Sequence, residues 1–404
     1  MTSRDRILTT HVGSLIRPTE LTDFLLKRQN RESYDERAYE ECLRRSVVDV
    51  AKKQAEIGID IISDGEFGKN ISWSRYVLER MSGFEERQGA GVGSIRATAG
   101  KDRRDFAEFY AEYEAAQGFV GMGRSSARTG LWYVTGPIAY TGHAAIKRDI
   151  DDLKAALKDI NVEGVFLPVV APGSVAPERG EEYYKSSEES LFAIARALRE
   201  EYRAIIDAGF ILQIDDAFLA SYYDVMVPPA SLADYRKWAQ IRLDATNEAI
   251  SGLPAERIRY HVCWGSWNGP HTNDVPVQDI VDLILRLKVG GISLEMANPR
   301  HEHEWRVWES VRLPDDKVLL PGVVTHSTNI VEHPELVAER IVRLANLVGR
   351  ERVIASTDCG FAQGPFTRRV HPSIQWAKLA SLVEGADIAS RQLWKRPAHQ
   401  RSVA

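Results

Sequence analysis

The sequence predicts a single α/β domain built as a (β/α)8 barrel, and three observations lead to this fold class. Apolar runs of strand length recur along the chain, stretches with helical 3.6-residue spacing separate most of them, and many runs end in Gly, Ser, Asp or His. Strands that alternate with helices form parallel sheets. The length suits one large barrel or two modest domains. Because no linker divides the chain, we expect one domain over residues 1–404.

Nine runs qualify as strands, which is one more than a closed eight-stranded barrel needs. One of them is therefore a hairpin strand or lies outside the ring, and Leu131–Gly136, beside an irregular region, is a candidate for that place. The nine runs are Ile7–Ser14, Asp60–Glu66, Leu131–Gly136, Val165–Ala171, Phe210–Asp216, Ile258–Gly265, Gly291–Ala297, Val318–Thr325 and Val353–Cys359.

Helices are expected between most of these runs, and two of them have Asp or Ser near their start as a cap. The last begins with Pro, which the first turn of a helix accepts. The predicted helices are Tyr34–Ile57, Glu188–Ala208, Ser231–Ile250, Val277–Leu287 and Pro334–Val348.

Residues 85–130 interrupt the alternation of strands and helices. A glycine-rich stretch that begins at Gly89 is followed by the charged, aromatic segment Arg103–Tyr113 and then by further glycines. We expect an insertion here. It forms a lid over the barrel mouth, a subunit contact in a homo-oligomer, or a plain excursion on the surface.

Composition and charge exclude several classes of protein. The 44% hydrophobic and 27% charged residues are typical of globular domains. No run approaches the roughly 18 apolar residues of a membrane span, and the start lacks the apolar stretch of a signal peptide, so a cytoplasmic protein is expected. A net charge of −5 without a basic block makes nucleic acid an unexpected partner. Three cysteines, an odd count, argue against a disulfide framework.

A histidine and a cysteine two positions apart indicate a metal site. His261 and Cys263 close an apolar run, and residues two apart in a strand point to the same side, so an imidazole and a thiolate can bind one ion. Taken alone, this pair more often marks a partly buried histidine beside an inert cysteine.

Two later runs supply further ligands. Glu295 lies within an otherwise apolar run, where a buried carboxylate costs several kcal/mol unless a cation compensates it. Cys359 ends the last run, and functional groups of parallel barrels gather at the carboxyl ends of their strands. If the barrel forms, the N/S/O/S donors suit a tetrahedral Zn2+ ion. The predicted ligands are His261, Cys263, Glu295 and Cys359.

The kind of ligand indicates what the zinc would do. Two thiolates and a carboxylate more than balance the charge of the ion, which disfavours activation of water. Such a site suits an incoming thiol that binds as its thiolate and stays nucleophilic at neutral pH. A zinc hydrolase and a non-catalytic zinc- or thiol-binding protein are the less favoured alternatives.

With these ligands the sequence resembles the C-terminal catalytic barrel of cobalamin-independent methionine synthase, and especially its shorter single-barrel relatives. Nearly the whole chain takes part, through the segments Thr9–Ser14, Asp64–Phe67, Leu212–Asp216 and Pro321–Ser327. That family is a TIM barrel whose zinc binds the sulfur of homocysteine and which moves a methyl group from a folate to it. The resemblance implies a zinc-dependent methyl- or alkyltransferase that acts on a small-molecule thiol and an alkyl donor.

The resemblance also assigns roles to residues outside the metal set. Ser14, Glu66 and Asp215 would hold the amino-acid part of the thiol, and His326 would serve in proton transfer. Glu66 and Asp215 are counted with His326 among the predicted catalytic residues. Asp216 replaces a Glu of the family pattern and is added to the predicted substrate-binding residues. Ordinary structural roles remain alternatives: Ser14 ends a strand, the acidic residues cap neighbouring elements, and His326 is a satisfied histidine.

Some segments depart from methionine synthases. The loop Val169–Ser174 lacks the Trp-bearing stretch associated with pterin binding, so it does not support a folate donor. The Trp- and His-rich segments His261–His271 and Asn298–Trp305 resemble a divergent branch that includes the epoxyalkane:coenzyme M transferases. Those enzymes open an epoxide with a sulfonated thiol, and the reverse reaction is that of a C–S lyase.

Charged residues near two strand ends are candidates for contacts with the substrate. Arg300 is predicted to bind an anionic group of the substrate, and Arg17 is a comparable candidate; either is as readily a surface charge. The pairs of His and Glu residues over 301–304 could suggest a second metal. Strand alternation sends the members of each pair to opposite sides, which favours a hydrogen-bonded loop instead.

Overall fold

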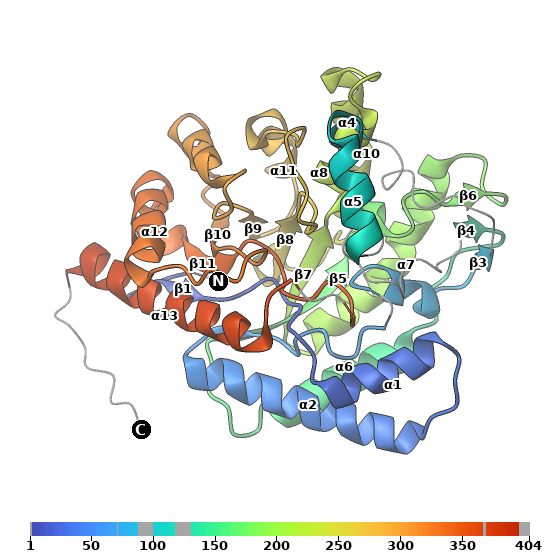
Figure 1. Ribbon diagram of the computed structural model, residues 1–404, viewed down its shortest axis with the longest axis horizontal. Helices are drawn as coiled ribbons and strands as arrows, with labels where there is room; N and C mark the ends of the chain where they lie inside the picture. Colours follow the sequence, from blue (N-terminus) through green and yellow to red (C-terminus); the bar gives the residue numbers. More distant parts are fainter. Residues whose placement is uncertain (1, 71, 88–99, 118–130, 367–368, 396–404) are drawn as a thin grey trace.

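The barrel predicted from the sequence is present in the structure (Figure 1). This computed structural model describes the chain except residues 1, 71, 88–99, 118–130, 367–368 and 396–404. The main sheet has eight strands in the order β1-β11-β10-β9-β8-β7-β5-β2, and every neighbouring pair is parallel. A parallel bridge between Thr10 and Ile61 joins the two ends of this order and closes the ring.

Each strand of the ring falls within one of the predicted runs or begins one residue before it. The strands are β1 (Leu8–Thr9), β2 (Ile61–Ile62), β5 (Gly164–Val170), β7 (Ile211–Asp216), β8 (Ile258–Val262), β9 (Gly291–Leu294), β10 (Val318–Val324) and β11 (Ile354–Thr357).

The ninth predicted run lies outside the ring. It forms β4 (Leu131–Val134), which pairs with β3 (Phe84–Arg87) in antiparallel fashion and with β6 (Gly180–Glu181) in parallel. These strands make a separate three-stranded sheet, which flanks the barrel in Figure 1. Sequence alone left this placement open, because a four-residue apolar run has the same pattern inside or outside a ring.

Long helices surround the ring, and four of the five predicted helices are present in the structure. Their caps also agree: Asp35 accepts a hydrogen bond from the Ala38 backbone N–H, and Ser231 forms a capping box with Asp234. The long helices are α1 (Thr19–Gln29), α2 (Glu36–Ile57), α6 (His143–Ala156), α7 (Ser187–Asp207), α10 (Leu232–Ala249), α12 (Pro334–Val348) and α13 (Pro372–Trp394). No helix in the described residues is both long and apolar enough to cross a membrane.

Two local predictions were wrong. The helix expected over Val277–Leu287 is a 3-10 turn, η6 (Val277–Asp279), followed by the short α11 (Val281–Ile284), because Ile280 between them has a φ of −131°. Residues 302–309, for which strand alternation was assumed, form the 3-10 helix η7 (Glu302–Glu309). Helices α1, α6 and α13 were not predicted.

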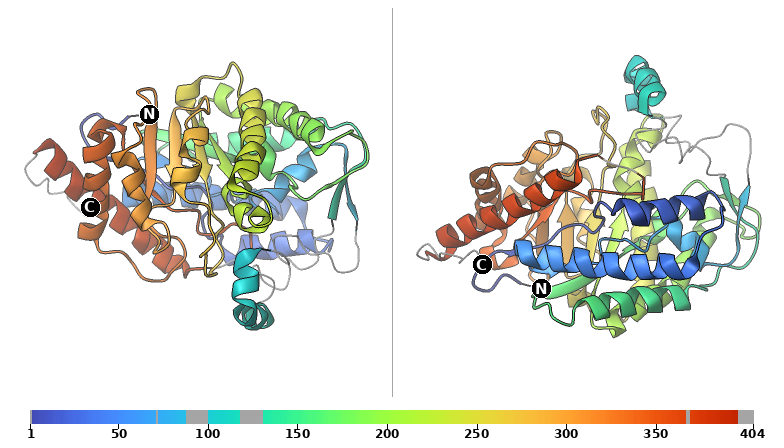
Figure 2. Two further views of the ribbon diagram at one scale, coloured as in Figure 1. Left: turned by 90° about the horizontal axis from the view of Figure 1, so that it is seen from above. Right: turned by 60° about the horizontal axis from the view of Figure 1, so that its bottom comes forward.

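The insertion reaches the loops at the carboxyl end of the barrel. Its described helices, α4 (Lys101–Asp105) and α5 (Ala107–Gln117), project from the body in Figures 1 and 2. The Asp102 carboxylate accepts hydrogen bonds from the backbone and hydroxyl of Thr272, at 3.1 and 2.5 Å, and Trp267 donates its indole N–H to the Tyr110 hydroxyl at 3.2 Å. Both partners belong to the loop after β8. The glycine-rich stretch from Gly89 lies outside the described residues.

The inside of the ring is apolar at one level and polar at the next. A cluster of apolar side chains that includes Phe166, Ile211 and Leu320 fills it beside β1. Above it lies Arg259, fully buried, which donates hydrogen bonds to Gln213 Oε1, Thr10 Oγ1 and the His11 carbonyl at 2.7 to 3.0 Å. Its guanidinium group also covers the Phe166 ring at 3.7 Å. Arg259 therefore connects β8 to β7 and to the segment that closes the ring.

Replacement of Arg259 by Ala is expected to destabilise the protein strongly. The change leaves the acceptors on Gln213, Thr10 and His11 buried without their donor, and such losses cost on the order of 3 kcal/mol or more. Urea unfolding followed by circular dichroism measures the change in the free energy of unfolding. Arg312→Ala, at an exposed arginine, is the control. Equal stability of the two variants would contradict the role of Arg259.

Candidate active site

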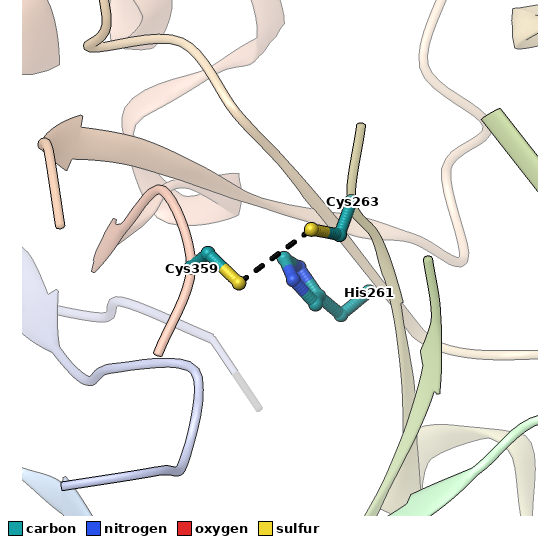
Figure 3. A group of neighbouring side chains, drawn as sticks. All are labelled: His261, Cys263 and Cys359. Carbon is teal, nitrogen blue, oxygen red and sulfur yellow. Dashed lines mark hydrogen bonds between the residues drawn. The ribbon is translucent and has the colours of Figure 1, made fainter. Parts of the chain in front are cut away.

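Three of the four predicted metal ligands converge at the carboxyl end of the barrel. His261 belongs to β8, Cys263 follows it, and Cys359 follows β11. Their ligand atoms all lie within 4.8 Å of one another, and the two Sγ atoms are 3.6 Å apart. Figure 3 shows the three side chains pointing toward a common centre. Because β9 and β10 separate β8 from β11 in the ring, only the closed barrel brings the two cysteines together.

The pairing of neighbouring strands fixes the height of His261 in the barrel. Asp215 on β7 is paired with His261 on β8, which is paired with Ser293 on β9. Cys263 and Glu295 lie two residues beyond His261 and Ser293, just past the ends of β8 and β9. The two-residue period of a strand places each on the same side as the residue two positions before it. The predicted metal ligands therefore lie one layer above Arg259, at the mouth.

The three side chains suit a soft metal ion. Two Zn–S bonds of about 2.3 Å at a tetrahedral angle place the sulfurs about 3.8 Å apart, close to the observed 3.6 Å. Both ring nitrogens of His261 are buried without a hydrogen bond to any described residue. The neighbouring Cys359, and then burial, raise the pKa of the Cys263 thiol well above its ordinary value. A bound cation would reverse that effect and stabilise both thiolates.

Ser266 is part of this cluster, although the sequence did not single it out. Its hydroxyl lies 3.1 Å from the Cys359 sulfur and 3.6 Å from the Cys263 sulfur. The backbone N–H of Gly265 donates to the Cys263 sulfur at 3.2 Å. The signal in the sequence is a polar residue three positions after a ligand, on the turn that leaves the strand.

Glu295 lies at the end of β9, outside the group of three. Its carboxylate accepts hydrogen bonds from the Trp264 backbone N–H at 3.0 Å and from the Asn298 amide at 2.9 Å. Burial, and then the charge of Cys263, raise the pKa of Glu295 well above its usual value. The acid is thus close enough to interact with the cysteine site. Its coordination of a metal stays a prediction.

Asp358 fixes the turn that carries Glu295. The Asp358 carboxylate is fully buried and accepts hydrogen bonds at 2.8 Å from the backbone N–H groups of Met296 and Ala297. The Asn298 amide donates to Asp358 as well as to Glu295. A Cβ at Gly322 on β10 would collide with this carboxylate, which explains why that position has no side chain. An acidic residue directly before Cys359, in a buried run, was the signal available in the sequence.

Three predicted substrate residues lie near the group formed by His261, Cys263 and Cys359. Asp215 is buried, and burial raises its pKa to about 7, an effect that the charge of His261 opposes and that of Glu66 reinforces. Glu66 follows β2 and pairs with Lys69 at 3.1 Å. The Ser14 hydroxyl accepts a hydrogen bond from the Ala362 backbone N–H at 3.4 Å, in the loop after Cys359.

The backbone at Glu66 takes a conformation that costs energy. Its φ of 61° lies in the left-handed region, which residues other than glycine seldom adopt. Arg17, buried beneath the loop, donates to the Glu66 and Lys69 carbonyls and so fixes this turn. Arg17 is therefore a buried element of the loop, and strain of this kind commonly occurs at functional sites.

His326, which follows β10, is buried beside the same group. Neither of its ring nitrogens has a hydrogen-bond partner among the described residues. Burial, and then the positive charge of Arg369, lower its pKa well below 6.5. The imidazole is therefore neutral at physiological pH, and a neutral imidazole has a free lone pair that can accept a proton.

Two other predicted residues are engaged elsewhere. The Asp216 carboxylate accepts hydrogen bonds from Ser174 at 2.7 Å and Tyr260 at 2.8 Å, on the face of β7 opposite to Asp215. Arg300 is exposed and donates to the Thr272 carbonyl at 2.8 Å. Substrate binding by Asp216 or Arg300 stays a prediction.

The His/Glu segment after β9 forms a hydrogen-bonded loop, as the sequence suggested. His301 lies between the carboxylates of Asp274 and Glu304, at 3.0 and 2.9 Å, and these contacts raise its pKa to about 10 against the opposing effect of burial. His303 is exposed. A charged imidazole cannot bind a metal, and among the described residues only the His261 group has the spacing of metal ligands.

Comparison with known proteins identifies one matching family model and several relatives. The catalytic-domain model of the cobalamin-independent synthases matches residues 180–381, which include every predicted metal ligand. The 2-hydroxypropyl-CoM lyase of Xanthobacter autotrophicus is 24% identical over 88% of this chain and 87% of its own length. A methionine synthase of Thermococcus kodakarensis is 23% identical over 89% of this chain and 86% of its own.

Solved structures support the same fold. A B12-independent methionine synthase from a Shewanella species, determined with selenomethionine, superposes with a TM-score of 0.72 at 18% identity and covers 97% of this chain and 100% of that one. A putative enzyme of this kind from Listeria monocytogenes gives a TM-score of 0.62 at 22% identity, over 95% and 98%. Since the family match extends over half of the chain and includes both cysteines of the site, the chain belongs to the cobalamin-independent synthase family.

Proposed function

We propose that this protein is a zinc-dependent transferase that moves a methyl or larger alkyl group to the sulfur of a small thiol, with homocysteine as the leading acceptor. The buried His261, Cys263 and Cys359 group carries the proposal. Family membership supports it, because relatives in this family are named for reactions at a thiol or thioether sulfur. Glu295 is the proposed fourth ligand, one that a substrate sulfur can displace.

A zinc ion bound here would lower the pKa of an incoming thiol and keep its sulfur nucleophilic at neutral pH. The protein residues would align that sulfur with the alkyl donor. The barrel holds them rigidly, since the ring pairing and the Asp358 hydrogen bonds define their positions. Alignment of two reactants contributes several kcal/mol to catalysis.

Acidic groups near the site would bind the amino group of homocysteine. Glu66 and Asp215 are buried, and Asp215 is adjacent to His261 across the β7–β8 pair. Burial, and then the charge of Glu66, raise the pKa of Asp215, and an ammonium group placed between the two acids would oppose both effects. The Ser14 hydroxyl, beside the loop after Cys359, would bind another polar atom of the same amino acid.

His326 would move the proton. The substrate S–H bond breaks as the imidazole accepts its proton, the sulfur forms a bond to the saturated carbon of the donor, and the bond from that carbon to the leaving group breaks. His326 then gives the proton to the leaving group, so that atoms and charges balance.

A second function has a specific observation in its favour. The relative from Xanthobacter autotrophicus is named for a reaction of 2-hydroxypropyl-CoM. The same residues could add a sulfonated thiol to an epoxide, in which case His326 gives its proton to the alkoxide formed when the ring opens. The natural thiol distinguishes the two reactions.

Cobalt substitution tests the proposed function directly. Protein loaded with cobalt(II) is expected to show a stronger thiolate-to-metal absorption band when the acceptor thiol binds. Homocysteine, 2-mercaptoethanesulfonate, glutathione and cysteine are titrated in parallel. A band that strengthens with homocysteine supports the methyltransferase, and one with 2-mercaptoethanesulfonate supports the alternative. No change with any thiol on fully loaded protein would reject thiol activation.

The cysteine ligands give a second prediction. Cys263→Ser and Cys359→Ser are each expected to lose most of the bound zinc while the fold is largely retained, because the barrel core does not depend on one ion. Elemental analysis and circular dichroism measure the two properties. Cys42→Ala, a buried cysteine on α2, is the matched control and should retain the metal. Full zinc retention in either site variant would refute the ligand set.

Replacement of His326 by Ala is expected to slow alkyl transfer by about 100-fold or more, the usual contribution of a general acid or base. Zinc content and thiol binding should remain, since the proposed role concerns only the proton. Single-turnover kinetics with the best acceptor measure the rate, and the cobalt titration measures binding. An unchanged rate would remove His326 from the mechanism.

A further inference from the structure

Arg369 lies beside the cysteine site, in the loop between β11 and α13. Its Nε donates a hydrogen bond to Gln363 Oε1 at 3.1 Å. The amide nitrogen of the same Gln363 lies 3.9 Å from the Cys359 sulfur. A single side-chain amide therefore separates the guanidinium group from a proposed metal ligand.

Arg369 forms no ion pair with a carboxylate of the described residues. Among the described residues, no carboxylate lies within ion-pair distance of it, and its two terminal nitrogens make no hydrogen bond to them. Burial lowers its pKa, opposed by Tyr113 of α5 and then by Cys359 and Cys263. The side chain is nevertheless partly exposed, so a ligand can reach it.

An arginine in this position raises the free energy of the folded protein unless an anion pairs with it. Placing an unpaired charge in a partly desolvated position is unfavourable, and two parallel N–H donors are free to bind a planar or tetrahedral oxyanion. Gln363 fixes the direction of the side chain through Nε and leaves those donors available.

The charge of the metal site makes a nearby cation useful. Two thiolates and a carboxylate carry one more negative charge than Zn2+ balances, and the bound substrate thiolate adds another. A substrate with an anionic tail would be repelled unless a positive group lay near that tail. The positive charge of Arg369 also lowers the pKa of His326, the residue proposed to move the proton.

We propose that Arg369 binds the anionic group of the thiol substrate, a carboxylate or a sulfonate, and so makes the site selective for short acidic thiols. This inference rests on the proposed function and specifies its substrate class. It assigns the anion contact to a residue within the site, whereas Arg300, the residue favoured by the sequence, is exposed and hydrogen-bonded to the Thr272 carbonyl.

Thiol binding to cobalt-loaded Arg369→Gln tests the proposal without reference to turnover. The probes are 2-mercaptoethanesulfonate, 3-mercaptopropionate and homocysteine, with uncharged 2-mercaptoethanol for comparison. We expect the Kd of at least one acidic thiol to rise by roughly 10- to 100-fold, the loss of a charge-assisted hydrogen-bonded pair. The Kd of 2-mercaptoethanol should change by less than about threefold, within the range of a weak surface effect.

The pattern over the acidic thiols identifies the group that is bound. Selective loss of 2-mercaptoethanesulfonate assigns a sulfonate, and selective loss of 3-mercaptopropionate or homocysteine assigns a carboxylate. Arg312→Gln is the matched control. Arg312 is exposed and precedes β10, at the end of that strand away from His326 and the candidate site. This variant should bind all four thiols as the unmodified protein does.

Two outcomes would overturn the proposal. Equal weakening of acidic and neutral thiols would mean that Arg369 only balances the charge of the metal site, and unchanged binding would mean that it does not touch the substrate. If Arg369→Gln does not fold, Arg369→Lys retains the charge but loses the paired donors, and the same selective loss is required of it. Absence of a thiol-dependent band in the unmodified protein would instead reject the proposed function itself.

Discussion

Closure of the parallel ring around a buried arginine is the constraint on which the rest of the molecule depends. Arg259 connects β8 to Gln213 on β7 and to Thr10 and His11, next to the bridge that joins the first and last strands of the sheet order. Gly291 on β9 makes room for it, because a Cβ there would lie 2.9 Å from Arg259 Cβ. The metal group, one layer higher, inherits its geometry from this closed ring.

Ring closure explains why a metal site can form from residues that are far apart in the chain. Cys263 and Cys359 leave strands that are not neighbours, yet their sulfurs lie 3.6 Å apart. Asp358 adds a second connection, from the end of β11 to the turn after β9. The site is therefore built before any ligand arrives, and binding energy need not be spent on assembling it.

The distribution of charge links the proposed metal chemistry to the proposed selection of substrate. Buried acids and thiols surround the centre, and burial keeps the pKa of Asp215 near 7 and that of Glu295 well above its usual value. Such a site favours cations, whether a metal ion or an ammonium group. Arg369 is the cation that the site itself provides on the side of Cys359.

The sequence by itself determined the fold class and the nine strand-forming segments, and it predicted that His261, Cys263 and Cys359 lie together, because strand periodicity and the rarity of buried charges are local properties. It did not determine that Leu131–Gly136 leaves the ring, or that residues 302–309 turn as a 3-10 helix, since short segments take their conformation from what they pack against. The partners of Glu295 and the positions of Asp358, Ser266 and Arg369 were likewise decided only by tertiary structure. Their contacts join segments up to 93 residues apart, from Ser266 to Cys359, and only the closed barrel brings such segments together.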